Sequence, residues 1–360
     1  MASSGNDINS PIAEPAGELA RSGPAWRPVG ATLNSDVDPA AKLAPNALVR
    51  IHYGLSPVMS DDPRELHVPL AVMGGSADAE VWSASAPVQI GSVDGIHYSH
   101  DEETLFAWLQ LDEAALVSVE PASSHAYARM ERLLKRLGFP HWLRAWNYLS
   151  GINEGVGDEE RYRQFNAGRF HALANTPGFE RLLPAATAIG ARSGGLTICL
   201  LAARRAALQI ENPRQVSAYQ YPTTYGARSP SFSRATLQHC RERSVLFLSG
   251  TASIVGHQTT HVGDAIGQLE ATLVNIDTLL DHAGRLHFPE SLNGRFEPQA
   301  FKAYLRSPDV YALLAERLHE SLTVRASTAI LEADICRRDL LLEIEGVFVW
   351  KEGEPNGAGS

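Results

Sequence analysis

The sequence has few of the features that mark membrane, secreted or nucleic-acid-binding proteins. Its net charge is −10, which argues against nonspecific binding to nucleic acids or anionic membranes. No apolar run is long enough to cross a bilayer, and the N-terminus does not have the basic and then apolar pattern of a signal peptide. The three cysteines, Cys199, Cys240 and Cys336, are widely separated, which is typical of a reducing compartment. We therefore expect a cytoplasmic protein with neither a nucleic-acid nor a membrane partner.

Motifs for cofactors and metals are also missing. The chain contains neither a Walker A loop nor a GxGxxG sequence, so no nucleotide cofactor is indicated. His257 and His261 have the i, i+4 spacing of metal ligands, but no HExxH motif and no obvious third ligand accompany them. Ser253 is not part of a GxSxG elbow and is a poor candidate for a hydrolase nucleophile. We expect no organic cofactor and no metal.

The composition is that of a globular protein with tails at both ends. Its 360 residues are enough for two domains, and 44 % of them are hydrophobic. Residues 1–44 are rich in Ser, Gly, Pro and Ala without hydrophobic periodicity, so we expect a disordered tail, and residues 351–360 look the same. Between the tails we expect a first domain at 45–210, a polar loop at 211–236 and a second domain at 237–350.

A weak internal repeat predicts the fold class. The order strand, helix, strand, helix, β-rich end occurs twice: at 105–109, 124–137, 144–149, 159–174 and 186–202, and again at 245–249, 264–282, 301–305, 309–322 and 324–350. The sequence Thr-Ala-Ile occurs at 187–189 and at 328–330, where each β-rich end begins. Gly284 is expected to end the helix at 264–282. This mixed order predicts an α+β fold in which helices cover one face of each sheet.

Glu343 is the first candidate for chemistry. In a strand at 340–345, Leu341, Glu343 and Glu345 share one face, with aliphatic residues between them. A carboxyl group in such surroundings loses hydration and binds its proton more tightly, so it can act as a general acid near neutral pH. The alternative is a solvated carboxylate at a strand edge, or one paired with Arg337 or Arg338.

The polar loop and two small residues supply further candidates. The segment 219–230 concentrates hydrogen-bond donors suited to an anion, including Tyr219, Tyr221, Tyr225 and Arg228, although an ordinary surface loop would look similar. Gly250, at the end of a core strand, would let a ligand approach the backbone, or else marks a bulge or turn. Cys336 is either a small buried hydrophobe or a thiol that shapes or assists a site, and we count it with Glu343 as a candidate catalytic residue.

Several of these segments resemble known families. The segments 246–250, 264–284 and 341–347 resemble the RidA (YjgF-like) family, and the segments 219–233, 247–260 and 334–346 more specifically resemble the chorismatase family. This resemblance implies an α+β fold of two tandem RidA/YjgF-like (chorismate-mutase-like) units, with mixed sheets and helices packed on one face. It also implies an enzyme that releases pyruvate from chorismate without a metal or an organic cofactor.

The resemblance also implies roles for particular residues. Chorismate carries two carboxylates, an enol ether at ring C3 and a hydroxyl at C4. Glu343 would protonate the departing enolpyruvyl group. The carboxylates would be bound by Tyr221, Tyr225, Arg228 and a second arginine, for which we expect Arg317, with Arg306 and Arg325 as alternatives.

The combination of Gly250 with Cys336 resembles the branch of the family that aromatises the ring. In that branch the C4 hydroxyl displaces pyruvate and 3-hydroxybenzoate forms, with or without 4-hydroxybenzoate. The proposed role of Gly250 is to leave space for the ring. Three alternatives remain: hydrolysis to a dihydroxycyclohexadiene carboxylate, imine deamination of the RidA type, or noncatalytic binding of a small anion. Thr328 replaces the catalytic arginine of RidA proteins, which argues against deamination. We expect a monomer or a small homo-oligomer.

Overall fold

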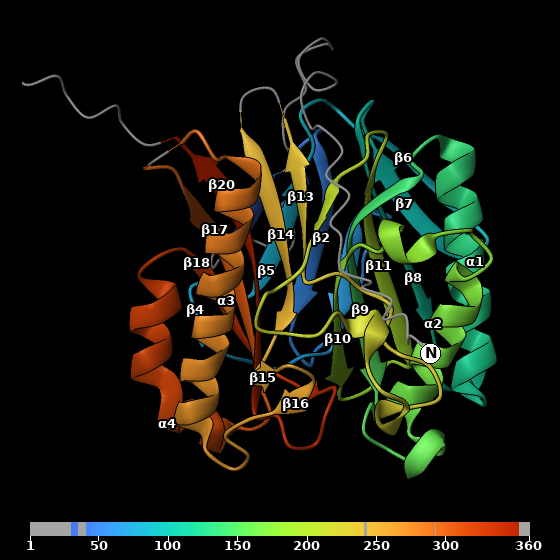
Figure 1. Ribbon diagram of the computed structural model, residues 1–360. Helices are drawn as coiled ribbons and strands as arrows, with labels where there is room; N and C mark the ends of the chain where they lie inside the picture. Colours follow the sequence, from blue (N-terminus) through green and yellow to red (C-terminus); the bar gives the residue numbers. More distant parts are fainter. Residues whose placement is uncertain (1–29, 35–40, 241–242, 292, 353–360) are drawn as a thin grey trace, which may run out of the picture.

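The computed structural model describes residues 30–34, 41–240, 243–291 and 293–352. Two seven-stranded sheets face each other across a shared core, and a four-stranded sheet covers a third side. The helices lie on the outer faces of the two large sheets, α1 and α2 on one and α3 and α4 on the other (Figure 1). In the described part of the chain, no helix is long and apolar enough to cross a membrane.

The first large sheet and its helices form the first unit. The strand order is β19-β10-β9-β11-β8-β7-β6. The bounds are β6 Gln89–Val93, β7 Ile96–His100, β8 Thr104–Leu111, α1 Val119–Leu137, β9 His141–Ser150, α2 Arg161–Leu173, β10 Ala185–Ala191, β11 Leu196–Ala203 and β19 Asp334–Ile335. Helix α1 buries Tyr127, Met130 and Leu134. It ends at Gly138, whose φ of 84° is a left-handed conformation that glycine adopts readily.

The second unit repeats this arrangement. Its strand order is β4-β18-β17-β20-β14-β13-β12. The bounds are β4 Val72–Gly75, β12 Leu208–Ile210, β13 Ala235–His239, β14 Ser244–Thr251, α3 Ala265–His287, β17 Arg295–Leu305, α4 Pro308–Leu318, β18 Ser327–Glu332 and β20 Leu342–Lys351. In both units the first strand of the β-rich end pairs in parallel with the strand between the helices, β10 with β9 and β18 with β17. The repeat predicted from the sequence is therefore confirmed.

One predicted helix end is wrong. Helix α3 continues through Gly284 to His287, and Gly284 is buried inside it. A Cβ atom at Gly284 would lie 3.2 Å from the indole ring of Trp350. The glycine thus allows α3 to pack closely against the sheet, and close packing, rather than chain termination, explains this residue.

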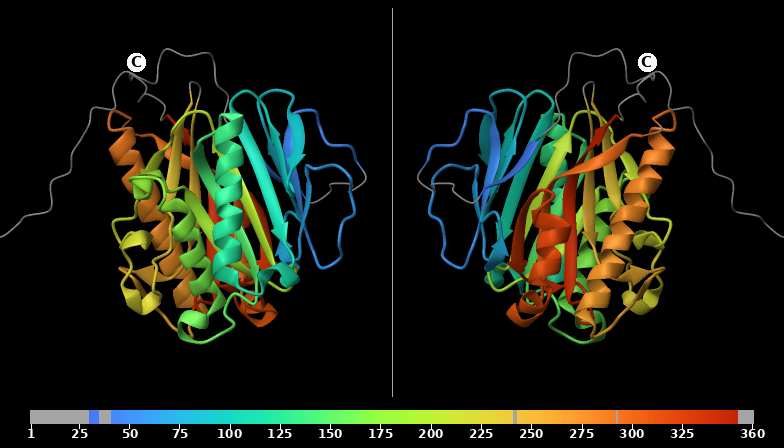
Figure 2. Two further views of the ribbon diagram at one scale, coloured as in Figure 1. Left: turned by 90° about the vertical axis from the view of Figure 1, so that its right-hand side faces the viewer. Right: turned by 90° about the vertical axis from the view of Figure 1, so that its left-hand side faces the viewer.

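The third sheet was not foreseen. It has the order β1-β5-β2-β3, formed by β1 Gly30–Asn34, β5 Ala79–Ser83, β2 Ala47–Tyr53 and β3 Glu65–Val68. Strand β1 lies in the segment expected to be a disordered tail, where it pairs with β5. Residues 1–29, 35–40 and 353–360 of the two expected tails lie outside the described residues. Figure 2 shows this sheet at the side of the molecule away from the helices.

Strands cross the expected domain boundaries. Strand β4 from the N-terminal part joins the second large sheet, and β19 from the C-terminal part joins the first. Strand β12, which precedes residue 211, also belongs to the second sheet. The central core contains large aromatic side chains such as Trp82 and Trp146, whose ring centroids are 5.3 Å apart. The two units are therefore built into one body by shared strands and a shared core.

Candidate functional site

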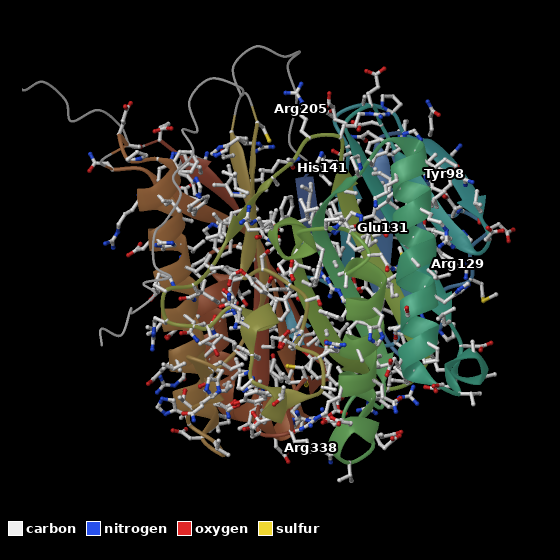
Figure 3. All side chains as sticks on the ribbon, turned by 45° about the vertical axis from the view of Figure 1, so that its right-hand side comes forward. Tyr98, Arg129, Glu131, His141, Arg205 and Arg338 are labelled. Carbon is white, nitrogen blue, oxygen red and sulfur yellow. The ribbon has the colours of Figure 1, made fainter. Side chains whose placement is uncertain are left out.

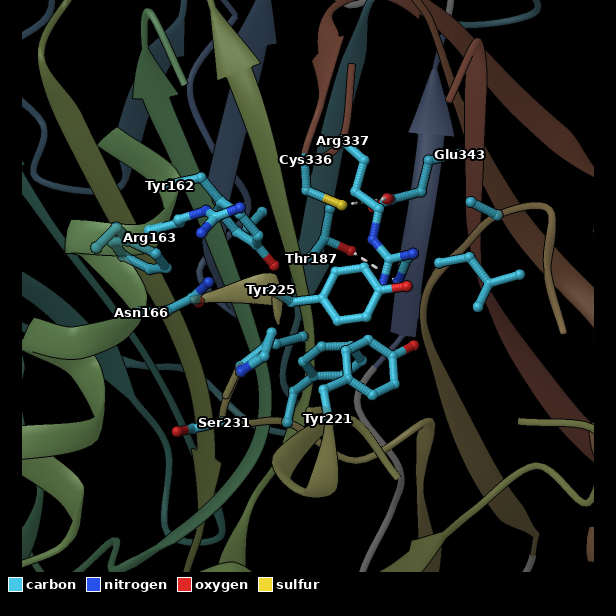
Figure 4. Close-up of a pocket in the computed structure, with 18 of the residues that line it drawn as sticks. Tyr162, Arg163, Asn166, Thr187, Tyr221, Tyr225, Ser231, Cys336, Arg337 and Glu343 are labelled. Carbon is cyan, nitrogen blue, oxygen red and sulfur yellow. Dashed lines mark hydrogen bonds between the residues drawn. The ribbon is translucent and has the colours of Figure 1, made fainter. Parts of the chain in front are cut away.

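A cavity of about 440 Å³ lies where the two units meet. There the first unit's β10 runs beside β13 and β14 of the second, and the amide of Gly250 donates to Thr187 Oγ1 at 3.0 Å. The lining residues come from α2, β10, the loop after β12, β14, the segment after β19 and β20 (Figure 4). A cavity of this size is suited to a small organic molecule.

Glu343 contributes a protonated carboxyl group to the cavity. It is the second residue of β20, its neighbours Leu342 and Ile344 point into the helix-covered core, and the residue is only 4 % exposed. Burial, and after it the negative charge of Glu345, raises the pKa of Glu343 to about 8, although Arg144 and Arg234 oppose the shift. The alternative of a solvated carboxylate does not hold. Glu343 retains its proton at neutral pH and can donate it.

Glu345, two residues further along β20, has the opposite character. Its carboxylate forms ion pairs with Lys302 at 2.8 Å and Arg144 at 2.6 Å, and it accepts a hydrogen bond from Trp146 Nε1 at 2.8 Å. Burial by itself would raise the pKa of Glu345, but the two cations outweigh it and hold the pKa below its usual range. The strand therefore presents one neutral and one ionised carboxyl group on the same face.

Cys336 lies next to the acid. Its Sγ is 4.0 Å from Glu343 Oε2 (Figure 4). Burial and the charge of Glu343 raise the pKa of the Cys336 thiol to about 12. The side chain is thus a neutral thiol at physiological pH and lacks the thiolate character of a nucleophile. Cys336 lines the cavity, and the role of its thiol there remains a prediction.

Gly250 is both a bulge residue and part of the cavity. The pairing of β14 with β20 shifts register between Leu248 and Thr251. A Cβ atom at Gly250 would lie 1.8 Å from Glu343 Oε1 and 2.6 Å from its Cδ. The space beside this glycine is therefore occupied by the carboxyl group of Glu343, whereas the sequence had suggested that it accommodates the substrate ring.

Two of the three predicted tyrosines line the cavity. Tyr221 and Tyr225 pack with ring centroids 5.4 Å apart, and the guanidinium of Arg337 lies 4.0 Å from the centre of the Tyr225 ring. The hydroxyl of Tyr221 accepts a hydrogen bond from Arg234 Nη2 at 2.7 Å, and that of Tyr225 is 3.2 Å from His257 Nδ1. The polar loop at 211–236 thus contributes aromatic rings and hydroxyl groups to the lining of the cavity.

Three predicted binding residues do not line the cavity. Tyr219 packs against the apolar cluster of Leu173, Phe179 and Leu183. Arg228 is exposed and stacks over the ring of Phe170 at 4.6 Å. Arg317 lies on α4, half exposed, and pairs with Glu270 at 3.5 Å. The alternatives Arg306 and Arg325 are also absent from the lining, because Arg306 pairs with Asp334 and Arg325 is exposed.

Other arginines take their place. The lining includes Arg163, Arg169, Arg234, Arg337 and Arg338. Arg169 is 3 % exposed, and neither its Nε nor its Nη2 has a hydrogen-bond partner among the described residues. Arg338 lies at the surface and donates to the carbonyl oxygen of Gly155 at 3.0 Å (Figure 3). A buried guanidinium whose N–H donors lack partners is suited to binding an anion. Unsatisfied buried donors are costly, and an anion would accept hydrogen bonds from them.

The sequence contained a signal for this arginine. Tyr162, Asn166 and Arg169 occur at i, i+4 and i+7, so they form one stripe on α2, and all three line the cavity. A stripe of polar residues on a helix that packs against a sheet is unusual for a purely structural helix. Arg234 had no comparable signal, because it lies in an irregular segment before β13.

The histidine pair does not gather metal ligands. Among the described residues, no group of three or more His, Cys, Asp or Glu side chains is placed to hold a metal ion. His257 instead contacts Tyr225, and its backbone oxygen accepts a hydrogen bond from Arg337 Nη1 at 2.9 Å. His257 thus contacts two residues that line the cavity, Tyr225 and Arg337.

Comparisons with known proteins agree with this description. A family model described as chorismatase FkbO/Hyg5-like, N-terminal, matches residues 80–202. The chain is 38 % identical to a chorismatase from Streptomyces hygroscopicus over 274 residues, which is 75 % of this chain and 79 % of the relative. It is 36 % identical to a 3-hydroxybenzoate synthase of the same organism over 301 residues, 81 % of this chain and 88 % of that relative.

A solved structure is similar along most of the chain. The crystal structure of a chorismatase matches with a TM-score of 0.79 at 33 % identity, over 89 % of this chain and 98 % of that one. The α+β class, with two repeated units and helices on one face of each large sheet, is confirmed.

Proposed function

This chain belongs to the chorismatase family, and from that premise we propose that it cleaves chorismate to pyruvate and 3-hydroxybenzoate. Chorismate supplies every atom of both products, so the reaction needs a proton donor and a binding site but no added atom. The observation that carries the proposal is the carboxyl group of Glu343, which is buried in a cavity lined with arginine and tyrosine and whose pKa burial raises to about 8.

Glu343 starts the reaction. Its proton is transferred to the methylene carbon of the enolpyruvyl group, which leaves a positive charge on the ether carbon and oxygen and weakens the bond from that oxygen to ring C3. The C4 hydroxyl attacks C3 and gives its proton to the Glu343 carboxylate, the C3–O bond breaks, and pyruvate departs. Glu343 then protonates the oxygen of the three-membered intermediate as its C4–O bond opens, and the carboxylate takes the proton that ring carbon C3 loses, which gives 3-hydroxybenzoate and restores the acid. The acid is favoured in this role because its pKa of about 8 keeps it loaded at neutral pH.

Arg169 and Arg234 take the place of the expected Arg228 and Arg317 as ligands for the two carboxylates. Arg169 offers free Nε and Nη2 donors, and Arg234 offers a free Nε while its Nη2 donates to Tyr221. Both are buried, so a carboxylate bound to either is shielded from water and held strongly. We assign one carboxylate of chorismate to Arg169 and the other to Arg234 with Tyr221.

Two residues favour the aromatising branch. Gly250 and Cys336 both adjoin the carboxyl group of Glu343, and this pair is the one that resembles the aromatising enzymes. The relative named 3-hydroxybenzoate synthase matches over most of the chain. Hydrolysis to a dihydroxycyclohexadiene carboxylate is the second candidate, because it requires the same protonation of the enol ether and differs only in the nucleophile.

The test is incubation of the purified protein with chorismate. Pyruvate release is followed with a coupled assay, and the ring products are separated by chromatography against 3-hydroxybenzoate, 4-hydroxybenzoate and the diol. Absence of pyruvate would end the proposal, and the diol as main product would select the hydrolytic candidate. Ammonia release from 2-iminobutanoate would indicate a deaminase, and chorismate binding in a calorimeter without turnover would indicate a binding protein.

We further propose a cytoplasmic location and a monomer or small homo-oligomer. The location is supported by the scattered cysteines and the acidic net charge. The assembly is supported by the cavity, whose lining is contributed by both units of one chain. Light scattering of the purified protein tests the assembly.

A further inference from the structure

Four buried charged side chains form a continuous chain behind the cavity. Glu80 pairs with Lys302 at 2.8 Å, Lys302 pairs with Glu345 at 2.8 Å, and Glu345 pairs with Arg144 at 2.6 Å. Each of the four is at most 4 % exposed. They come from β5, β17, β20 and β9, so all three sheets contribute. We call these four residues the core charge cluster.

Further contacts hold the core charge cluster rigid. Tyr53 donates to Glu80 at 2.6 Å, and Trp146 donates to Glu345 at 2.8 Å. The indole ring of Trp146 also lies 5.1 Å from the Arg144 guanidinium and 5.1 Å from the Lys302 ammonium group. Every charge in the cluster is thus fixed by at least one neighbour, so its field at the cavity does not fluctuate with side-chain rotation.

The four charges of the core charge cluster balance one another without Glu343. Its ion pairs contain two positive and two negative charges. Ionisation of Glu343 would add a negative charge two residues from Glu345, in surroundings where charges interact far more strongly than in water. The charged and titratable groups that face Glu343 are Glu345 on β20, Arg144 on β9, Arg234 before β13, Cys336 after β19 and Tyr162 on α2.

We propose that the core charge cluster sets how readily Glu343 gives up its proton, and that Glu345 and Arg144 are positioning residues which act on the reaction through Glu343. This proposal rests on the proposed function, and it adds which buried charges determine the pKa of the general acid Glu343. Glu345 lowers the tendency of Glu343 to ionise, Arg144 increases it, and Lys302 with Glu80 keeps Glu345 permanently charged. Thr187 links the cluster to the cavity wall, since its hydroxyl donates to Glu345 and accepts from Arg144 and from the Gly250 amide.

The cluster predicts changes of opposite sign for two single variants. Glu345→Gln removes a negative charge, so the pKa of Glu343 should fall by about one unit or more. Arg144→Gln removes a positive charge, so the pKa should rise by about one unit or more. The double variant Arg144→Gln/Glu345→Gln leaves the balanced pair of Glu80 and Lys302, and its pKa should lie between those of the two single variants. Damage to the fold alone would not produce shifts of opposite sign.

The experiment titrates Glu343 in the ligand-free protein. Infrared spectroscopy detects the carbonyl band of a protonated carboxyl group, and Glu343→Gln identifies the band by removing it. Circular dichroism establishes that each variant is folded. If a single variant does not fold, the charge-balanced double variant is titrated in its place. The alkaline limb of kcat/KM with chorismate should move in the same direction as the band.

The outcomes separate the two proposals. Opposite shifts of the band support the core charge cluster, even if chorismate is not turned over. Shifts in the same direction, or none, overturn it even if pyruvate is released normally. Glu80→Gln is the matched control, since Glu80 belongs to the cluster but lies beyond Lys302. A larger shift for Glu80→Gln than for Glu345→Gln would also overturn the proposal.

Discussion

The carboxyl group of Glu343 fills the space that any side chain at Gly250 would need. A Cβ atom at Gly250 would lie 1.8 Å from Glu343 Oε1, closer than atoms that are not bonded can approach. The identity of residue 250 is therefore coupled to the position of the acid. A larger residue at this position would change where the proton is delivered as well as the room available to the ring.

Gly250→Ala should impair turnover and change the products. The added methyl group must displace the Glu343 carboxyl group, so we expect kcat to fall about tenfold or more and the diol to increase at the expense of hydroxybenzoate. Pyruvate release and product chromatography measure both effects. Gly284→Ala, at a buried glycine outside the cavity, controls for the cost of adding a methyl group. An unchanged rate and product ratio would contradict the coupling of Gly250 to Glu343.

The pH dependence should report a donor with a pKa of about 8. The reaction needs the protonated form of Glu343, so kcat/KM should be level below that pKa and fall about tenfold per unit above it. Glu343→Gln should be folded and inactive. A rate that rises with pH through this range would show that the ionised form is active and would remove Glu343 from the role of acid.

Glu343→Gln should also change the pH dependence of stability. The pKa of Glu343 is raised in the folded protein, so the folded state binds more protons than the unfolded state between the ordinary value of 4.5 and about 8. The contribution of this residue to stability is therefore lost as the pH rises through that interval. Thermal unfolding should give Glu343→Gln a higher Tm than the wild type at about pH 8, with a smaller difference at about pH 5. An equal difference at both pH values would contradict the raised pKa.

Arg169→Gln should weaken substrate binding. The variant loses the free Nε and Nη2 donors assigned to a carboxylate, and a hydrogen bond to a charged group contributes about 1.5–3 kcal/mol, so KM should rise about tenfold to a hundredfold. Arg169→Lys, which keeps the charge, should restore part of the loss. Arg317→Gln and Arg228→Gln, at exposed arginines outside the cavity, should leave KM unchanged. A larger rise in KM for either control variant would indicate that the carboxylate binds at that arginine and not at Arg169.

Cys336→Ala should affect products more than pyruvate release. The thiol is neutral because its pKa is about 12, so it supplies no nucleophile, and the variant should release pyruvate at a rate within about tenfold of the wild type. The share of 3-hydroxybenzoate among the ring products should fall, since Sγ lies beside the proton donor. Cys240→Ala, at a cysteine outside the cavity, is the control. Complete loss of pyruvate release would indicate a direct chemical role for the thiol.

The sequence alone determined most elements of the two repeated units, the repeat itself and the candidate acid, but not the third sheet. Helical and strand periodicities are local, so the stripe of α1 and the alternation that puts Glu343 and Glu345 on one face of β20 could be predicted. Tyr221, Tyr225, Gly250 and Cys336 were found through local composition and family resemblance, and all of them line the cavity. The roles assigned to them remain predictions.

Only the tertiary structure decided which distant residues meet. Arg317 and Arg169 are both arginines on helices, and what separates them is that α4 exposes the first while α2 turns the second into the cavity. The third sheet was not predicted, so the pairing of Glu80 on β5 with Lys302 could not be predicted either. The strand pattern around Lys302 likewise did not indicate that its ammonium group would be buried among other charges. Charge balance in a buried core depends on distances between segments far apart in the chain, and periodicity does not encode those distances.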